Sequence, residues 1–325
     1  MPVVSVLMVF HRDTPFLRPA IASVLGQTWR DLELVLVDNG TGLTAEALGE
    51  AGRDPRLRWV RLARNEGIPR GHNAGMAAAR GEFIALLDHD DLALPARIER
   101  QVELLRTDSR LGLVASRAET IDDAGRVLGP EFALLAPAAQ KIYTQYAAPV
   151  VTPAYTGRRE VFTALPYREI FPLAADFDFL ARAAERWPMA GVDEVLLRYR
   201  RHSAQATQVH AVAIEQSRAE IRLLTARRRA GRPEGELPPA SGRAAPPTAA
   251  ECCRQMARRC LEEGFGPLAL YHARRAFALE RSVGSGLRAV GFACRAFPRL
   301  RTGERGLGAK LFLQGPLRAH GLAPH

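Results

Sequence analysis

The sequence predicts an α/β fold with a largely parallel sheet, and three observations lead to that prediction. Up to about residue 112, short β-branched and apolar runs alternate with segments that have helical spacing. The connections between these segments are short, as they are where helices cover a parallel sheet. Turn-forming residues, such as Asp38-Asn39-Gly40, end several of the apolar runs.

The first region supplies most of the expected sheet. We expect its strands at residues 3–10, 32–37, 57–62 and 83–87. We expect its helices at residues 15–25, 68–80 and 95–106, and a glycine follows each of the first two. In such sheets ligands bind beyond the carboxyl ends of the strands. Asp38 and Asp88 directly follow expected strands and are therefore candidate ligand contacts.

The rest of the chain is expected to be less regular and to end in a helical tail. Between residues 113 and 205 we expect strands at 113–116 and 195–199 and a helix at 178–186. A helix at 211–229 precedes residues 231–250, which are rich in Pro, Gly and Ala and suit a flexible linker. Further helices are expected at 251–263, 267–281 and 285–297. We therefore expect a domain at 1–230, a linker at 231–250 and a basic helical tail at 251–325, whose first two helices resemble one degenerate tetratricopeptide-type unit.

Composition places the chain among globular proteins. Its 325 residues fit one large domain or two ordinary ones, and 47% of them are hydrophobic and 25% charged. No apolar run reaches the roughly 18–20 residues that span a bilayer. The start, MPVVSVLMVF, lacks the basic residues and cleavage site of a signal peptide, so we expect a cytoplasmic protein. The four cysteines have no zinc-binding spacing and suit buried positions on helices.

The positive charge is concentrated in the tail. Residues 251–325 contain 13 Lys and Arg against 5 Glu, so this segment holds +8 of the net charge of +10. One interpretation is peripheral contact with an anionic membrane at its inner face. The other is an arginine-rich genome, which would produce the same bias without any partner. We expect no binding of nucleic acid.

Three aspartates stand together after the fourth expected strand. The stretch FIALLDHDDLALP places Asp88, Asp90 and Asp91 within four positions. Carboxylates at this density suit a hard cation such as Mn²⁺ or Mg²⁺, which shares its ligand shell with phosphates. On an extended segment, residues two apart point the same way, so Asp88 and Asp90 can hold one ion. The alternative is a solvated turn in which Asp91 caps the next helix.

Several ordered motifs between residues 3 and 202 resemble the inverting glycosyltransferases of family 2. They are Phe10-His11 at the end of the first strand, SVLGQTW at 23–29, VDNG at 37–40, the N-x-G, N-x-G and A-x-G pattern between Asn65 and Gly81, LDHDD at 87–91, the stretch PLAADFDFLAR at 172–182, and YRRH at 199–202. The resemblance implies the GT-A fold of nucleotide-diphospho-sugar transferases, here with a small helical extension. The chain departs from the family pattern at His11, where Asn is usual, and at Ala175, where an acid is usual.

The resemblance also implies roles for individual residues. For binding the donor it points to Phe10, Asp38, Asn65, Asn73, Asp88 and Arg201. For the metal, Mn²⁺ or Mg²⁺, it points to Asp88, Asp90 and His202. The general base would be Asp176, with Asp178 as its rival. Alternative roles remain open for Asn65 and Asn73, which also suit helix capping and loop hydrogen bonds.

The implied activity is a metal-dependent inverting transfer of a hexose-type sugar. The donor would be a nucleotide-diphosphate sugar, with UDP expected, and the acceptor a hydroxyl on a glycan or lipid-linked molecule in bacterial cell-surface glycan assembly. One alternative is a non-catalytic scaffold that binds nucleotide sugars. Another is a nucleotidyltransferase, although residues 3–15 lack the glycine- and arginine-rich phosphate loop such enzymes use. A dinucleotide-dependent oxidoreductase is disfavoured because no G-x-G-x-x-G follows the first strand.

Overall fold

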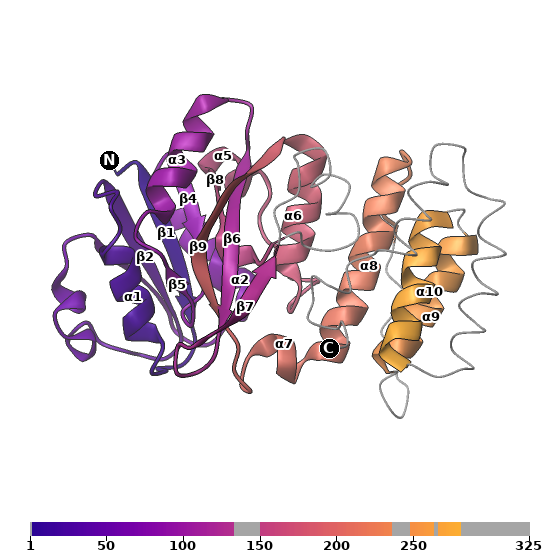
Figure 1. Cartoon of the computed structure of the whole chain (residues 1–325), viewed down its shortest axis with the longest axis horizontal. Coiled ribbons are helices and arrows are strands. Elements are labelled where there is room, and N and C mark those ends of the chain that lie inside the picture. The colour runs from indigo at the N-terminus through magenta and orange to yellow at the C-terminus, as the bar shows by residue number, and fades with distance from the viewer. Residues whose placement is uncertain (1, 133–149, 236–247, 263–265, 281–325) are drawn as a thin grey trace. The chain divides into compact units, whose positions relative to one another are not determined.

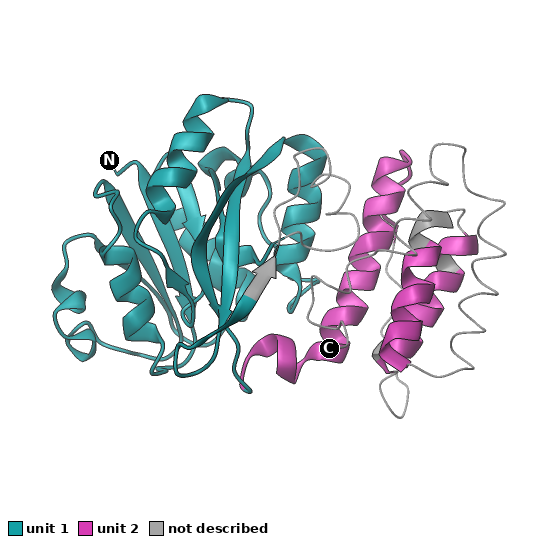
Figure 2. Cartoon of the chain, in the orientation of Figure 1, with its two compact units in different colours: residues 1–144, 148–203 teal, residues 145–147, 204–325 magenta. Residues whose placement is uncertain are grey.

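The computed structural model describes residues 2–132, 150–235, 248–262 and 266–280. The helix expected at 285–297 and most of the expected linker lie outside these residues. The chain divides into two compact units (Figure 2). Unit 1 comprises residues 1–144 and 148–203, and unit 2 comprises residues 145–147 and 204–325. This division falls after residue 203. The domain boundary expected at residue 230 stays a prediction.

Unit 1 contains a nine-stranded sheet among its described residues (Figure 1). The main path runs β3-β2-β1-β4-β8-β6-β9-β5, and β7 pairs with β6 off this path. The strands are β1 (Val4–Phe10), β2 (Leu32–Asn39), β3 (Leu57–Leu62), β4 (Phe83–Leu86), β5 (Leu92–Ala93), β6 (Leu113–Ile121), β7 (Val127–Phe132), β8 (Tyr155–Arg158) and β9 (Met189–Arg200).

Strand direction brings many carboxyl ends to one edge of the sheet. Strands β1, β2, β3 and β4 are parallel to one another, and β6 is parallel to β9. Strand β8 lies antiparallel between β4 and β6, so β6 and β9 run in the same direction as β4. Six of the nine described strands therefore share one direction, and β5, β7 and β8 oppose it. Ligand contacts can come together at the shared carboxyl edge.

The helices of unit 1 flank the sheet. They are α1 (Leu17–Leu25), α2 (Ile68–Ala78), α3 (Arg97–Thr107), α5 (Arg159–Ala164) and α6 (Ala175–Arg186), with 3₁₀ turns at Glu46–Leu48, Ala51–Arg53 and Thr152–Ala154. Right-handed crossovers place α1 and α2 on opposite faces, because β1 to β2 and β3 to β4 progress in opposite directions across the sheet. A Cβ on Gly75 would lie 2.1 Å from Leu7 and 2.8 Å from Val37, so this glycine lets α2 pack closely on β1 and β2.

The expected order of elements from residues 3 to 107 is confirmed, whereas several boundaries shift further along the chain. Strand β6 continues to Ile121 and β9 begins at Met189, because the two strands pair with each other over that whole length. Helix α6 begins at Ala175, three residues before the expected start. Asp176 therefore lies in the first turn of this helix. Strand β2 includes Asp38 and Asn39, which pair with residues of β3.

Unit 2 is helical in its described residues. Its helices are α7 (Ala206–Val209), α8 (Ala211–Arg229), α9 (Ala249–Glu262) and α10 (Gly266–Glu280). The helices expected at 211–229, 251–263 and 267–281 are thus confirmed within two residues. A buried cluster joins α8, α9 and α10 through small and apolar side chains such as Leu223, Ala257 and Leu270. Within the described ranges, every helix is too short or too polar to cross a membrane.

Candidate active site

Three carboxylates meet beyond the carboxyl end of β4. One oxygen from each of Asp88, Asp90 and Asp91 lies within 4.8 Å of the other two. Asp91 is fully buried, Asp90 is 9% exposed and Asp88 is partly exposed. We call this group the acid triad. The interpretation of Asp91 as a solvated helix cap is wrong, because Asp91 is buried and α3 begins after Ala96 without a side-chain cap.

Burial and crowding raise the pKa values of two members of the acid triad, Asp88 and Asp91. Burial, followed by the charges of Asp90 and Asp176, raises the pKa of Asp88 to about 8. Burial and the charges of Asp90 and Asp88 raise the pKa of Asp91 well above its usual value. Both effects disfavour the ionised carboxylates, and a bound cation would relieve both.

The end of β9 fixes the acid triad from one side. The backbone N–H of Arg200 donates to Oδ1 of Asp91 at 2.8 Å, and its Nε donates to the carbonyl of Asp90 at 2.9 Å. Nη1 of Arg200 donates to the carbonyls of Asp122 and Asp123 at 2.7 and 3.1 Å. Arg200 is 4% exposed and its guanidinium lies over the ring of Phe16, so it anchors the turn that holds the triad.

His202 contacts the acid triad through Asp90. Its Nε2 lies 2.9 Å from Oδ2 of Asp90, and its ring packs against Phe16 with centroids 5.2 Å apart. Two neighbouring ligands of an octahedral ion, each about 2.1 Å from the metal, are about 3.0 Å apart. The separation of these two atoms therefore suits adjacent ligands of one ion as well as a hydrogen bond.

A buried arginine, Arg97, acts on the triad through its charge. Arg97 is fully buried, and its Nη2 donates to the carbonyl of Leu86 at 2.8 Å. Its Nη1 has no hydrogen-bond partner. Burial lowers the pKa of Arg97 to about 10, while the charges of Asp91 and Asp88 act in the opposite direction. Arg97 thus offsets part of the negative charge of the triad and stays protonated at neutral pH.

The donor set fits a divalent cation. Hard ions of the Mn²⁺ and Mg²⁺ class take carboxylate oxygens and tolerate imidazole nitrogen. Oδ2 of Asp91 is buried and has no hydrogen-bond partner, although a buried carboxylate oxygen ordinarily needs one. This oxygen lies beside two other carboxylates and is therefore available to coordinate a cation.

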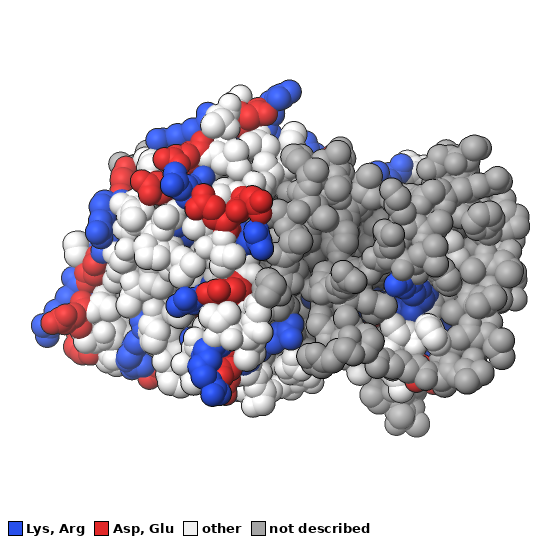
Figure 3. Space-filling model, viewed as in Figure 1, with Lys and Arg blue, Asp and Glu red and all other residues white. Residues whose placement is uncertain are grey.

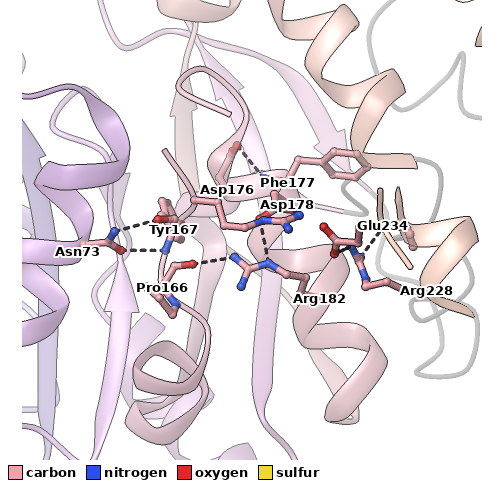
Figure 4. A network of polar contacts seen from close by, with 11 residues as sticks. Asn73, Pro166, Tyr167, Asp176, Phe177, Asp178, Arg182, Arg228 and Glu234 are labelled. Carbon is pink, nitrogen blue, oxygen red and sulfur yellow. Dashed lines mark hydrogen bonds and ion pairs between the residues drawn. The ribbon is translucent and has the colours of Figure 1, made fainter. Parts of the chain in front are cut away.

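Asp176 and Asp178 differ in what holds them. Oδ2 of Asp176 accepts from the hydroxyl of Thr152 at 2.8 Å, and Oδ1 accepts from the N–H of Phe177 at 2.8 Å. Asp176 is partly exposed, and its charge raises the pKa of Asp88. Asp178 is fully buried and accepts from Arg168 and from Arg182, whose Nε lies 2.8 Å away (Figure 4). Asp176 is therefore available to a substrate, whereas Asp178 ties two arginines together.

Asp38 and Asn65 form part of the turn after β2. Asp38 is 1% exposed, and its Oδ1 accepts from both the N–H and the hydroxyl of Thr41 at 2.7 Å. Oδ1 of Asn65 accepts from the N–H of Gly67 at 2.9 Å and from Nδ2 of Asn39 at 3.2 Å. Gly40 has a φ of +86°, and a Cβ there would lie 2.2 Å from the backbone of Arg64, so the turn requires glycine. Donor binding by Asp38 and Asn65 stays a prediction.

The other expected donor contacts are dispersed. Phe10 is 1% exposed and packs edge-on against Trp59, with ring centroids 6.4 Å apart. Both polar atoms of the Asn73 side chain bond to the backbone of Tyr167. The backbone N–H of Arg201 donates to the carbonyl of Ile121 at 2.9 Å. The structure therefore brings Asp88, Asp90, His202 and Asp176 to one site, while the roles of Phe10, Asn73 and Arg201 stay predictions.

Three further residues complete the site in roles that the sequence analysis did not predict. Asp91 supplies the third acid, and the signal for it was the third aspartate of the DHDD run. Arg97 is the first residue of the amphipathic helix α3, and its full burial has no signature in the sequence. The anchoring role of Arg200 depends on the pairing of β9 with β6, which the sequence does not reveal.

Comparison with known proteins agrees with this geometry. Residues 5–165 match the family model described as glycosyl transferase family 2. The chain is 29% identical over 207 residues to an uncharacterised glycosyltransferase of Methanocaldococcus jannaschii, covering 61% of this chain and 71% of that protein. It is 38% identical over 102 residues to the succinoglycan biosynthesis protein ExoO of Rhizobium meliloti, covering 31% of this chain and 29% of ExoO.

Solved structures extend the likeness to the fold. The crystal structure of residues 1–349 of TarS from S. aureus matches with a TM-score of 0.57 at 14% identity, covering 98% of this chain and 89% of that one. The same TarS segment in complex with UDP-GlcNAc matches with a TM-score of 0.56 at 13% identity, covering 98% and 90%. The sheet order, the flanking helices and these matches establish the GT-A fold. The motifs, the family model and the fold agree, and residues 5–165 belong to the family 2 glycosyltransferases.

Proposed function

We propose that this chain is a metal-dependent, inverting transferase of the hexosyl type. It would move a sugar from a nucleotide-diphosphate donor to a hydroxyl acceptor. The observation that carries the proposal is the meeting of the acid triad with Asp176, whose charge acts on Asp88 from a separate segment of the chain. An inverting transfer needs a site for the donor diphosphate and, apart from it, a base for the acceptor.

Asp88, Asp90, Asp91 and His202 are the residues that would hold Mn²⁺ or Mg²⁺. When bound, the ion neutralises charge on the diphosphate as it leaves. Arg97 keeps its positive charge, which limits repulsion among the acids before a donor binds. Arg201 follows the anchored Arg200 and is our candidate for a further contact with the diphosphate.

Asp176 is our candidate for the general base. It would accept the proton of the acceptor hydroxyl as that oxygen attacks the anomeric carbon. The bonds from Thr152 and from the N–H of Phe177 fix the direction of the carboxylate. A carboxylate has about four acceptor positions, so these two bonds leave Asp176 able to accept another hydrogen bond. Ala175 stands where the family pattern has an acid, so Asp176 has no acidic neighbour directly before it in the sequence.

The expected donor is a UDP-sugar, and the expected setting is cell-surface glycan assembly. The TarS structures in complex with UDP and UDP-GlcNAc support the nucleotide. The name of ExoO, a succinoglycan biosynthesis protein, supports the setting. The acceptor would be a glycan or a lipid-linked molecule, reached from the cytoplasmic side. Catalysis would belong to residues 1–230, and the tail at 251–325 would serve another purpose, such as peripheral contact with an anionic membrane.

Surface charge bears on the membrane hypothesis. Figure 3 shows Lys and Arg interspersed with Asp and Glu on the visible face of unit 1. Arginines of this unit commonly pair with carboxylates, as Arg100 does with Glu103 and Glu194 at 3.3 and 3.6 Å. The described residues on this face of unit 1 form no uniformly basic surface, so the membrane hypothesis assigns the contact to the basic tail. It is tested by comparing the binding of the full chain and of a chain ending at Ala230 to vesicles that contain anionic lipid.

The donor site is tested by calorimetric titration of UDP, GDP and dTDP, each with and without Mn²⁺. We expect one nucleotide to bind in a Mn²⁺-dependent way and Asp90→Ala to abolish that dependence. Release of the same nucleotide from its sugar conjugate would then separate an enzyme from a non-catalytic binding scaffold. If none of the three nucleotides binds with Mn²⁺ present, the proposal is wrong.

A further inference from the structure

A buried phenol beside the candidate active site has no hydrogen-bond partner. Tyr167 lies in the loop between α5 and α6 and is 2% exposed. Its hydroxyl oxygen is buried and unpaired. Because an unpaired buried hydroxyl costs stability, a protein that keeps one usually has a use for it.

The loop around Tyr167 is held at three successive residues (Figure 4). The side chain of Asn73, from α2, donates to the carbonyl of Tyr167 at 2.9 Å and accepts from its N–H at 2.8 Å. The carbonyl of Pro166 accepts from Nη2 of Arg182 at 2.8 Å. Arg168 donates to Asp178 on α6, with Nε at 2.9 Å. The backbone that presents the phenol is thus fixed from both α2 and α6.

The ring of Tyr167 is fixed as well. The ring of His72 stacks on it with centroids 5.0 Å apart and planes at 16°. The ring of Phe179, from α6, packs against it at 5.4 Å. With the backbone and the ring both held, the direction of the hydroxyl is set before any ligand arrives.

Tyr167 lies beside the turn of α6 that carries the base candidate, because its ring packs against Phe179, three residues after Asp176. The pKa of Tyr167 is raised well above the usual value, mainly by burial and then by the charges of Asp176 and Asp88. The hydroxyl therefore stays protonated at neutral pH and can donate a hydrogen bond.

We propose that the hydroxyl of Tyr167 donates a hydrogen bond to the sugar that is transferred, and that Asn73 acts as its positioning residue. This inference rests on the proposed function. In an inverting transfer the sugar lies between the leaving diphosphate and the attacking acceptor, that is, between the acid triad and Asp176. A hydroxyl beside the helix turn that carries Asp176 is placed to meet the sugar on the acceptor side. Sugar oxygens are suitable acceptors for it.

The test compares Tyr167→Phe with a matched control, Tyr155→Phe. Tyr155 is also fully buried with an unpaired hydroxyl, and burial alone raises its pKa, with no carboxylate acting on it. Both substitutions remove one unpaired hydroxyl, so both variants should fold with an unfolding temperature equal to or above that of wild type.

The probes are UDP and four UDP-sugars, those of glucose, galactose, N-acetylglucosamine and N-acetylgalactosamine, all with Mn²⁺. We expect Tyr167→Phe to lower kcat/KM for Mn²⁺-dependent release of UDP from the preferred sugar about five- to tenfold, as befits one hydrogen bond. The Kd of UDP itself should change less than twofold. Tyr155→Phe should change neither quantity.

Each other result has a defined meaning. If wild type releases UDP and Tyr167→Phe matches it, this inference is wrong and the proposed function stands. If Tyr167→Phe raises the Kd of UDP by the same factor as it lowers kcat/KM, the residue acts through the structure of the site. The contact with the sugar is then ruled out. If wild type neither binds UDP nor releases it from any of the sugars, the proposed function fails and this inference fails with it.

Discussion

Both units of this protein bury acidic side chains, and the acid triad of unit 1 and Glu215 of unit 2 have opposite surroundings. In unit 1, three aspartates meet, and one buried oxygen of Asp91 has no hydrogen-bond partner. In unit 2, Glu215 is 3% exposed and accepts from Nη1 of Arg222 at 3.0 Å and from Nη2 of Arg275 at 2.6 Å. Those bonds join two turns of α8 to α10.

The pKa values follow this difference. Burial and neighbouring acids raise the pKa values of Asp88 and Asp91. Burial alone would also raise the pKa of Glu215, but Arg222 and Arg275 outweigh it and lower the pKa. The comparison indicates that Glu215 is compensated within the fold and serves stability. The acid triad is only partly compensated by Arg97, which is the condition expected of a site that awaits a cation.

The largest expected effect is at Asp176. Asp176→Asn should reduce sugar transfer by about 10²- to 10⁴-fold, because the amide cannot accept the acceptor's proton. Binding of the nucleotide with Mn²⁺ should stay within about twofold of wild type, since Asp176 lies outside the acid triad. Steady-state turnover and calorimetry on the same preparation measure both quantities. Retained turnover in the variant would assign the base to another residue.

The second-largest expected effect is a difference in stability between substitutions at Glu215 and in the acid triad. Glu215→Gln should destabilise unit 2 by about 3–5 kcal/mol, because it leaves two buried arginines without their carboxylate. Asp90→Asn should leave unit 1 as stable or more stable, because it removes repulsion among three acids. Denaturant unfolding of both variants measures the difference. An equal loss of stability at the two positions would show that the acid triad is also a structural device.

The smallest expected effect is a dependence on pH. The folded pKa of Asp88 is raised, so in the absence of metal its favourable protonated form is lost as the pH rises through about 8. A cation needs the ionised form, so Mn²⁺-dependent nucleotide binding should weaken about tenfold per pH unit below 8. Glu215 has a lowered pKa, so its contribution to stability should persist over the same range and disappear only in strong acid. Titrations at pH 6, 7 and 8, paired with unfolding curves, would measure both trends.

The parallel part of the fold could be predicted from the sequence because its strands are nearly continuous apolar runs. Every residue of β2 is buried, as in a parallel strand that is covered on both faces. Strand β8, with the sequence YTGR, could not be predicted, because it is short and polar and becomes a strand only between β4 and β6. The long pairing of β6 with β9 likewise depends on contacts between distant segments.

The residues of the candidate site likewise divide into those that the sequence predicts and those that it does not. Asp88 and Asp90 could be predicted because they follow a buried strand directly and lie in one short motif. Tyr167 could not, because its partner Asn73 is 94 residues away in the sequence and either residue alone looks ordinary. The expected donor contact at Asn73 rested on a glycine-spaced motif, whereas in the fold the amide holds the loop of Tyr167. Local motifs locate the acids, and long-range contacts decide which other side chains face them.

The most direct test of the difference between the acid triad and Glu215 is thermal unfolding with and without ligand. The ligand is Mn²⁺ together with whichever of the three nucleotides binds in the calorimetric titration. A ligand that binds only the folded state raises the unfolding temperature. We predict such a rise for unit 1 in wild type and in Glu215→Gln, and none in Asp90→Asn. An equal rise in Asp90→Asn, or no rise in wild type with UDP, GDP or dTDP, would contradict the assignment of the acid triad as the metal and donor site.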